Sequence, residues 1–309
     1  MKTLKELSDE LAKKQPQMAD SVTEEAPILN IIPFQESSHP MWNMAEEVAD
    51  VTGAGWVDMN APLPVVDAST NLRKVDLNVF GGEIEVPEDT AKMFGGKERY
   101  FGKKMPKVLR RSGMTAEQRI LYENMRQYAI DNGKAITAGA SSGGTYSIIC
   151  CRFSEGENCG LYSPEGFKQG AMLDIQPING GDIYKPASGL YAGVLVYGLR
   201  LKAYLGYQLL NANTVSTICN IAAGNIPTAM MIDDMIAKAR GVANGKTFLF
   251  MHPRCKSLLA SMKGTALNMT PEDKNYDRQL EKWSGIPLMT SFNMLDAGET
   301  VTSGLPASF

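Results

Sequence analysis

The amino-acid sequence predicts an α+β protein, because three kinds of segment follow one another along it. A helix with a capping signature starts near residue 115, and a stretch rich in β-branched and aromatic residues follows it. A module of alternating helices and strands then occupies 225–294. The chain has 309 residues, enough for one large or two ordinary domains with real cores. Its 44% hydrophobic and 21% charged residues indicate an ordinary globular protein.

Composition limits the chemistry that the chain can perform. The formal net charge of −3 favours neither an acidic nor a basic partner. Only His39 and His252 are available, so His-rich metal sites and most His-based acid–base designs have little material. Five cysteines without the spacing of a small secreted domain indicate reduced thiols. No apolar run approaches the ~20 residues of a membrane span, and charges near the N-terminus oppose an export signal.

The first 40 residues predict an arm that lies along a surface. Leucines repeat at helical spacing up to Pro16, and an apolar patch covers 28–34 between prolines. A short leucine stripe cannot fold alone, so it must dock on something. The patch either contacts another molecule or packs on the arm's own domain. The candidate contacts with other subunits in this arm are Leu4, Leu7, Leu11, Ile31 and Phe34.

Residues 50–86 predict a long β-hairpin that continues into a sheet. The segment 56–59 precedes a tip rich in proline and small residues at 61–70, and apolar and polar residues alternate from Val75 onward. Two strands alone are marginal in water, so the hairpin needs a neighbour in this chain or in another copy. The candidate contacts with other subunits in the hairpin are Trp56, Pro62 and Pro64.

A basic run at 97–111 contains seven Lys or Arg residues and a single acid, Glu98. Such a run contacts nucleic-acid phosphates, forms a solvated loop, or pairs with acidic neighbours. The candidate DNA-facing or charge-pairing residues are Lys103, Lys104, Lys107, Arg110 and Arg111.

A capping box at 115–118 predicts the start of an amphipathic helix, which Gly133 ends. Its apolar face contains Leu121, Met125, Tyr128 and Ala129. Strands are predicted at 146–153, 172–176 and 190–205, and the last is long enough to pair twice or to bend at Gly198.

The C-terminal module begins with a helix that Asn225 is expected to cap. Its apolar stripe consists of Ile232, Met235, Ile236 and Ala239. A continuously apolar strand at 247–251 follows, as expected of a strand covered on both faces. A second amphipathic helix comes after Pro253, and 285–289 is a strand.

Reactive groups are sparse. The loop that begins at Gly139 and ends at Tyr146 is rich in glycine and serine but lacks P-loop and nucleophile-elbow spacing. Cys150 and Cys151 are expected on opposite faces of a strand, and Cys255 lies on an apolar helical stripe, so buried structural thiols are expected. We therefore expect no catalytic site, no metal and no cofactor.

The order of these elements resembles that of the major capsid proteins of tailed bacteriophages with the Hong Kong 97-like fold. The positions that carry the likeness are Asn220 and Ile221, 250–253 (Phe-Met-His-Pro), 283–288 (Trp-Ser-Gly-Ile-Pro-Leu) and 294–299. Bacterial encapsulin shells share that fold and are the nearest alternative family. A hydrolase or transferase that uses the loop from Gly139 to Tyr146 is a more remote alternative.

The resemblance implies an α+β fold with an N-terminal arm, an extended β-hairpin (the E-loop), a peripheral domain with a long spine helix and long β-sheet, and an α/β axial domain. The implied boundaries are 1–45 for the arm, 46–82 for the E-loop, 83–214 for the peripheral domain with its spine helix at about 115–133, 215–292 for the axial domain, and 293–309 for a return to the peripheral domain.

The same resemblance implies a structural protein without catalysis that assembles as hexamers and pentamers into an icosahedral shell around double-stranded DNA. The implied partners are copies of the chain, non-specifically bound DNA, and scaffolding, portal and decoration proteins, with no membrane. The implied location is the virion, after assembly in the host cytoplasm.

Overall fold

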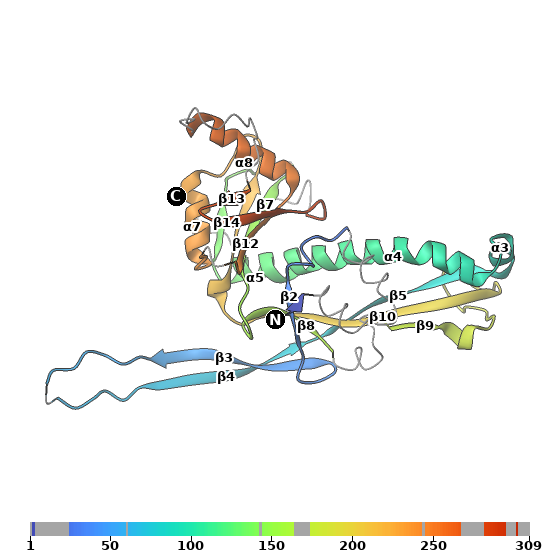
Figure 1. The fold of residues 1–309 in the computed structure, drawn as a ribbon, viewed down its shortest axis with the longest axis horizontal. Helices are drawn as coiled ribbons and strands as arrows, with labels where there is room; N and C mark the ends of the chain where they lie inside the picture. Colours follow the sequence, from blue (N-terminus) through green and yellow to red (C-terminus); the bar gives the residue numbers. More distant parts are fainter. Residues whose placement is uncertain are drawn as a thin grey trace.

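The computed structural model describes residues 2–3, 25–59, 61–141, 144–163, 174–242, 245–266, 281–294 and 301. Within these ranges the chain forms two six-stranded sheets, a separate two-stranded hairpin and one long helix. The long helix extends to one side of the molecule and the hairpin to the opposite side (Figure 1). The second sheet and its helices stand above the place where the long helix and the hairpin meet, so the molecule is elongated and not spherical (Figure 1).

One sheet, the long sheet, lies under the long helix (Figure 1). Its central strand β10 pairs with β5 along one edge and with β9 and then β8 along the other, so the expectation that this strand pairs twice is confirmed. The strands of the long sheet are β1 (Lys2–Thr3), β2 (Pro33–Glu36), β5 (Asn78–Pro87), β8 (Asn158–Tyr162), β9 (Asp174–Pro177) and β10 (Val196–Leu209).

The other sheet, the module sheet, has the order β13-β14-β12-β7-β11-β6 and carries two helices. Its strands are β6 (Ala135–Thr137), β7 (Tyr146–Arg152), β11 (Val215–Ile221), β12 (Thr247–Met251), β13 (Lys282–Trp283) and β14 (Ile286–Thr290). Its helices are α7 (Ala229–Lys238) and α8 (Pro253–Ala266). Short 3₁₀ turns lie at Ile178–Gly181 and Ala212–Thr214.

The strand predicted at 146–153 exists as β7, but it belongs to the module sheet. It lies between β11 and β12, and its two faces are covered by different cores, with Cys150 in one and Cys151 in the other. A strand covered on both faces needs the continuous apolar run that this segment has. The implied boundary between 214 and 215 therefore does not separate the two sheets, because β6 and β7 precede it.

The C-terminal module otherwise forms as predicted. The stripe of α7 is buried against the sheet, and β12 and β14 pair in parallel. The cap is wrong, because the Thr228 side chain, and not Asn225, accepts the helix N–H, from Met231 at 3.3 Å. Asn225 instead pairs through its backbone with Ala222.

The long helix is one continuous run from Lys97 to Asp131. It consists of α4 (Lys97–Arg119), a π-helical segment (Ile120–Arg126) and α5 (Gln127–Asp131), and α3 (Glu88–Met93) precedes it. The predicted start at Thr115 is wrong: the Thr115 hydroxyl donates to the Arg111 carbonyl at 3.0 Å, a bond made inside a helix. The basic run at 97–111 is therefore helical and not a loop.

Tertiary packing explains why the helix begins so early. Gly102, Pro106 and Gly113 together oppose a helix by about 5 kcal/mol. Their neighbours on one face are buried against the long sheet, and burying such side chains contributes about 1.5–3 kcal/mol each. The buried face at this end consists of Phe101, Met105 and Leu109. Burial thus offsets the intrinsic cost, which single-residue propensity does not show.

The described part of the N-terminal segment belongs to the core of its own chain. Ile28 and Ile32 are fully buried, and β2 pairs in parallel with β8. Gly160 on β8 is required there, because a Cβ atom would lie 2.4 Å from the Phe34 ring. Of the two alternatives for the apolar patch, packing on its own domain is correct.

The buried carboxylate of Glu117 joins three distant segments of the chain. It lies on α4 and is completely buried. Its Oε2 accepts from the backbone N–H groups of Ile28 at 2.9 Å and Leu29 at 3.4 Å, and its Oε1 accepts from Ser291 Oγ and from Asn293 Nδ2, the latter at 3.1 Å. One side chain therefore holds the N-terminal segment and the segment after β14 against the long helix.

We predict that Glu117→Ala lowers the free energy of unfolding by about 3–5 kcal/mol, because several buried donors lose their acceptor at once. Glu117→Gln should cost less, since the amide keeps one acceptor oxygen. Denaturant titration of both variants checks this order. Replacement of the exposed Glu123 by alanine on the same helix is the control, and an equal effect at both positions would contradict the role of Glu117.

The stability of the subunit should also depend on pH through this group. Burial raises the pKa of Glu117 above 4.5, and the hydrogen bonds from Ser291, Asn293, Ile28 and Leu29 oppose that shift. Because the pKa is raised in the folded state, its contribution is fully present below about 4.5 and is lost as pH rises through the folded-state pKa.

We therefore predict that the difference in unfolding free energy between the natural chain and Glu117→Gln shrinks as pH increases across that window. Denaturant titrations at a series of pH values measure the difference. A difference that stays constant with pH would show that folding does not shift the pKa of Glu117.

Candidate intersubunit surfaces

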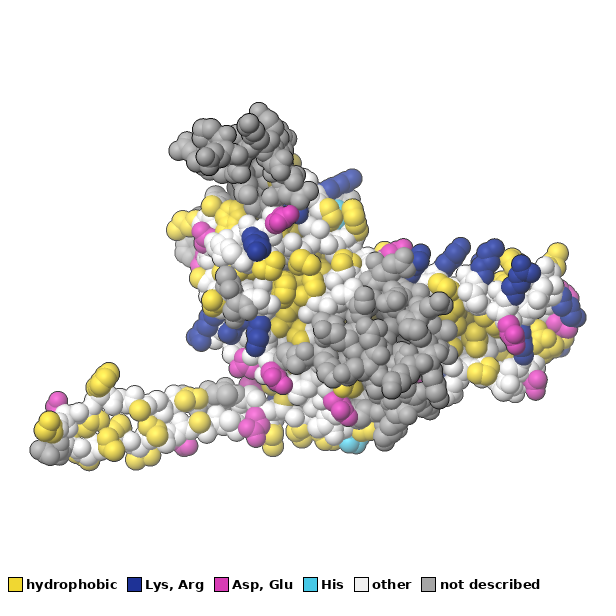
Figure 2. Space-filling view, in the orientation of Figure 1, with side chains coloured by type: hydrophobic (Ala, Val, Ile, Leu, Met, Phe, Trp, Pro, Cys, Tyr) yellow, Lys and Arg dark blue, Asp and Glu magenta, His cyan; other side chains and the backbone are white. Residues whose placement is uncertain are grey.

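The hairpin is the most exposed element of the subunit. It consists of β3 (Trp42–Thr52) and β4 (Asp67–Asp76), and it extends away from the rest of the molecule (Figure 1). Hydrophobic side chains line it in the space-filling view (Figure 2). Trp56 is fully exposed, and Pro62 and Pro64 are also exposed, so these predicted contact residues are available to a neighbour. The other large apolar side chains exposed near the tip are Met59, Leu63, Val65 and Val66.

The segment 56–59, expected to lie in the predicted hairpin just before its tip, is not a strand. The first strand of the hairpin ends at Thr52 and the second begins at Asp67, which are register partners, and the described connecting residues 53–59 and 61–66 have no strand structure. Glycines at 53 and 55 weaken a strand, and the prolines of the tip have no N–H to donate to a ladder. The first strand lies earlier, from Trp42, and the strand from Asn78 already belongs to the long sheet.

A buried polar contact fixes the base of the hairpin. Asn43 on β3 donates through Nδ2 to Gln208 Oε1 on β10 at 2.6 Å, and both side chains are almost fully buried. Gln208 Nε2 donates to the Gly156 carbonyl, and the Ser38 N–H donates to Asn43 Oδ1 at 2.9 Å. The side-chain amides of Asn43 and Gln208 thus both donate and accept hydrogen bonds. These buried bonds fix the direction in which the hairpin leaves the sheet.

A second attachment is electrostatic. Arg73 on β4 lies 3.5 Å from Glu47 on β3 and interacts with Tyr128 on α5. Burial raises the pKa of Tyr128, and Arg73 opposes that shift. The hairpin base is therefore tied to the long sheet and to the long helix, while the described side chains near its tip are almost all exposed.

Of two predicted contact residues in the described arm, one is buried and the other is half-buried. Phe34 is 3% exposed and Ile31 packs against the same core, so a contact with another subunit is wrong for Phe34. Its apolar character is used inside the subunit, beside Gly160. Leu4, Leu7 and Leu11 lie outside the described residues.

The basic residues gather on the outward side of α4, where dark blue side chains line the upper edge of the helix (Figure 2). Lys103, Lys104, Lys107 and Arg111 are exposed, and Arg110 is half-buried. Lys104 also lies over the Tyr100 ring, 5.7 Å from its centroid. The structure thus places four of the five predicted charge-bearing residues on an accessible helix surface.

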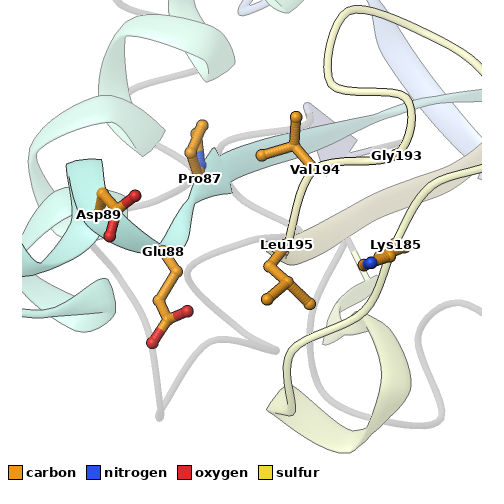
Figure 3. Close-up of a pocket in the computed structure, with 7 residues that line it drawn as sticks. All are labelled: Pro87, Glu88, Asp89, Lys185, Gly193, Val194 and Leu195. Atoms are coloured by element: carbon orange, nitrogen blue, oxygen red, sulfur yellow. The ribbon is translucent and has the colours of Figure 1, made fainter.

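A hollow of about 270 Å³ lies where β5 meets α3, at the end of the long sheet farthest from the hairpin (Figure 3). Its seven lining residues include no His, Cys, Ser or Thr. Glu88, one of its two acids, already forms an ion pair with Lys92 at 2.6 Å. The hollow therefore offers no hydroxyl or thiol nucleophile and no imidazole base among its lining residues.

Sequence reasoning missed several exposed apolar side chains in the segments that contribute to this hollow and next to them. The strand predicted from residue 190 begins only at Val196, so the residues before it lie in a loop with exposed side chains. Their β-branched and leucine-rich pattern is the same as that of a buried strand, so the sequence carries no signal of exposure. The group consists of Met93, Phe94, Leu190, Val194 and Leu195.

The loop from Gly139 to Tyr146 connects β6 to β7, and its central residues 142 and 143 lie outside the described ranges. A strand follows it, so it does not present a helix N-terminus to an anion. Cys255 is buried in the module core as expected, and burial raises the pKa of its thiol to about 12. His252 uses Nδ1 to accept from the Arg254 N–H, at 3.1 Å. Because its pKa is raised, the Cys255 thiol is protonated at neutral pH and is a poor nucleophile.

Across the described residues, no three His, Cys, Asp or Glu side chains are grouped as metal ligands. None of the helices in these ranges is both long and apolar enough to cross a bilayer. The exposed surfaces, and not a pocket of reactive groups, are the notable features of this subunit.

No family model and no curated protein matches the sequence. The fold, however, is similar to solved structures. A chain from the structure of bacteriophage Epsilon15 matches with a TM-score of 0.61 and 14% identity, over 89% of this chain and 88% of its own. A chain of the bacteriophage JBD30 capsid matches with a TM-score of 0.51 and 11% identity, over 91% and 96%.

The SrpI encapsulin from Synechococcus elongatus matches 63% of this chain and 87% of its own, with 11% identity and a TM-score of 0.43, too low to carry an argument. The two phage matches show that the chain has the Hong Kong 97-like fold, so the predicted fold class is confirmed.

We predict that Gln208→Ala loosens the hairpin at its base. The substitution leaves the Asn43 amide and the Gly156 carbonyl without this partner, which costs about 1–3 kcal/mol per buried group. Amide hydrogen exchange in β3 and β4 should become faster, while exchange in α7 should not change. Gln127→Ala, which removes an exposed glutamine bonded to Asp131, is the matched control. Equal exchange in both variants would contradict the anchoring role.

Proposed function

We propose that this protein is a shell subunit whose copies assemble as hexamers and pentamers into the icosahedral capsid of a tailed bacteriophage, around double-stranded DNA. The carrying observation is the hairpin, which is held firmly at its base and exposes its apolar tip. A two-stranded ribbon is marginal in water by itself, and clustered exposed apolar side chains mark an interaction site. The Hong Kong 97-like fold supports the same function.

In this proposal the domains have the roles that the sequence resemblance implies. The arm is 1–45, the E-loop is 46–82, the peripheral domain is 83–214, the axial domain is 215–292, and 293–309 returns to the peripheral domain. The E-loop reaches over a neighbouring copy, and Trp56, Pro62 and Pro64 contact that copy. Two structural details modify these limits: the hairpin strands begin at Trp42, and β6 and β7 join the module sheet.

The proposed protein performs no catalysis and needs no cofactor. Its partners are other copies of itself, packaged DNA, and scaffolding, portal and decoration proteins, without a membrane. Its place is the virion, after assembly in the host cytoplasm. Because the hairpin tip is covered only by a neighbour, subunit stability and assembly are linked by mass action.

We predict that shortening the hairpin blocks shells without unfolding the subunit. Thr52 and Asp67 are register partners, so an Asn-Gly pair in place of 53–66 closes the strands with a two-residue turn. The free energy of unfolding should change by less than about 1 kcal/mol, because almost all described side chains of 53–59 and 61–66 are exposed. Electron microscopy should show no closed shells, and normal shells would refute the role of the tip.

A pair of substitutions separates apolar contact from loop length. Trp56→Ser with Leu63→Ser keeps the length of the tip but removes two exposed apolar side chains. Met230→Ser with Val242→Ser removes two exposed apolar side chains from the module and serves as the matched control. Only the tip pair should reduce assembly.

A further inference from the structure

The outward surface of α4 carries a regular line of positive charge. The buried positions of the helix recur every fourth residue, from Phe101 through Met105 and Leu109 to Glu117. The exposed positions also recur every fourth residue, offset by two from the buried set, which places them about 200° around the helix axis. In the first half of the helix all four of these positions are basic: Arg99, Lys103, Lys107 and Arg111. We call these four residues the basic ridge.

The ridge is a geometric feature and not a scatter of charges. Successive members are about 6 Å apart along the axis, and the four span about 18 Å. The same line changes character farther along the helix, where Arg119 forms an ion pair with Glu123 at 2.8 Å and Gln127 donates to Asp131. Among the described residues, no acidic side chain lies within 4 Å of a ridge cation. The positive charge is therefore concentrated on one half of the helix.

The chemistry of the ridge fits one class of partner. Protein–protein contacts have aromatic or other apolar anchors and are depleted in lysine. Nucleic-acid backbone sites are instead polar, rich in Lys and Arg, and independent of base sequence. On the ridge, Gly102 and Lys104 are the exposed neighbours of Lys103, and neither supplies an apolar anchor. The tip of the hairpin, with its exposed Trp56, shows the opposite composition.

We propose that the basic ridge binds the phosphate backbone of double-stranded DNA without sequence specificity. This proposal rests on the proposed shell function. It implies a definite direction for α4 in the particle: the ridge faces the lumen, and the face of the long sheet turned away from α4 faces outward. A duplex carries one negative charge per ~1.7 Å of axis, so a line of four cations meets more phosphates than it can neutralise. Such contacts hold DNA against the wall and let it slide.

The experiment compares two full-length variants with the same change in charge. The ridge variant is Lys103→Gln, Lys107→Gln, Arg111→Gln. The control variant is Lys185→Gln, Arg240→Gln, Lys282→Gln, which also removes two lysines and one arginine from exposed positions. The probe is a fluorescently labelled random-sequence duplex of about 30 base pairs, and anisotropy gives its affinity between about 50 and 200 mM salt. Electron microscopy of each variant records shell formation separately.

The ridge variant should bind the duplex about tenfold or more weakly at the lowest salt, and the slope of log affinity against log salt should fall by about 2–3. The control variant should stay within about twofold of the natural chain. Equal affinities and slopes in the two variants would overturn the proposal.

A ridge variant that keeps its DNA affinity but no longer forms shells would assign the ridge to contacts between copies, and it too would overturn the proposal. A third outcome is that the natural chain never forms shells, while the ridge variant, and not the control variant, loses DNA affinity. That outcome would support DNA binding by the ridge and refute the proposed function.

Discussion

The buried carboxylate of Glu117 fixes the relation between the parts of this subunit. It accepts hydrogen bonds from Ile28, in the segment before β2, and from Asn293, in the segment after β14. The side chain is completely buried. Leaving such donors unpaired in a core is costly, so the three segments are constrained to meet at this point. The long sheet then extends along α4 in one direction, and the module sheet stands above the same helix (Figure 1).

The positions of the two exposed surfaces, the basic ridge and the hairpin, depend on this junction. The long helix packs one side against the long sheet. The other side of the helix faces solvent and carries the basic ridge. The hairpin leaves the other end of the same body, held by the Asn43–Gln208 contact. One surface is apolar and the other is cationic, so they suit different partners. In the proposed shell, another copy covers the exposed apolar tip of the hairpin.

The sequence predicted those features that local pattern determines. The apolar run of β12, the stripe of α7 and the burial of Cys255 follow from periodicity and appear as expected. The features it missed depend on distant contacts. The helix extends back to Lys97 through Pro106 only because the long sheet covers its apolar face.

The candidate surfaces show the same division. The exposure of Trp56 was predictable from a proline-rich tip, but the burial of Phe34 depends on Gly160, far away in the sequence. Glu117 was hidden for a related reason. Its capping-box position suggested a helix start, whereas its partners at Ile28 and Asn293 come from both ends of the chain. The spacing of the basic ridge became meaningful only when the whole run was seen to be helical.

The central claim is that the hairpin of each subunit is completed by a neighbouring copy in a closed shell. Electron cryomicroscopy of particles formed by the purified full-length chain, with scaffolding partners where needed, tests this directly. The account predicts icosahedral shells in which the tip around Trp56 lies against an adjacent subunit. A population of stable monomers under all conditions, or shells in which the tip projects into solvent, would contradict it.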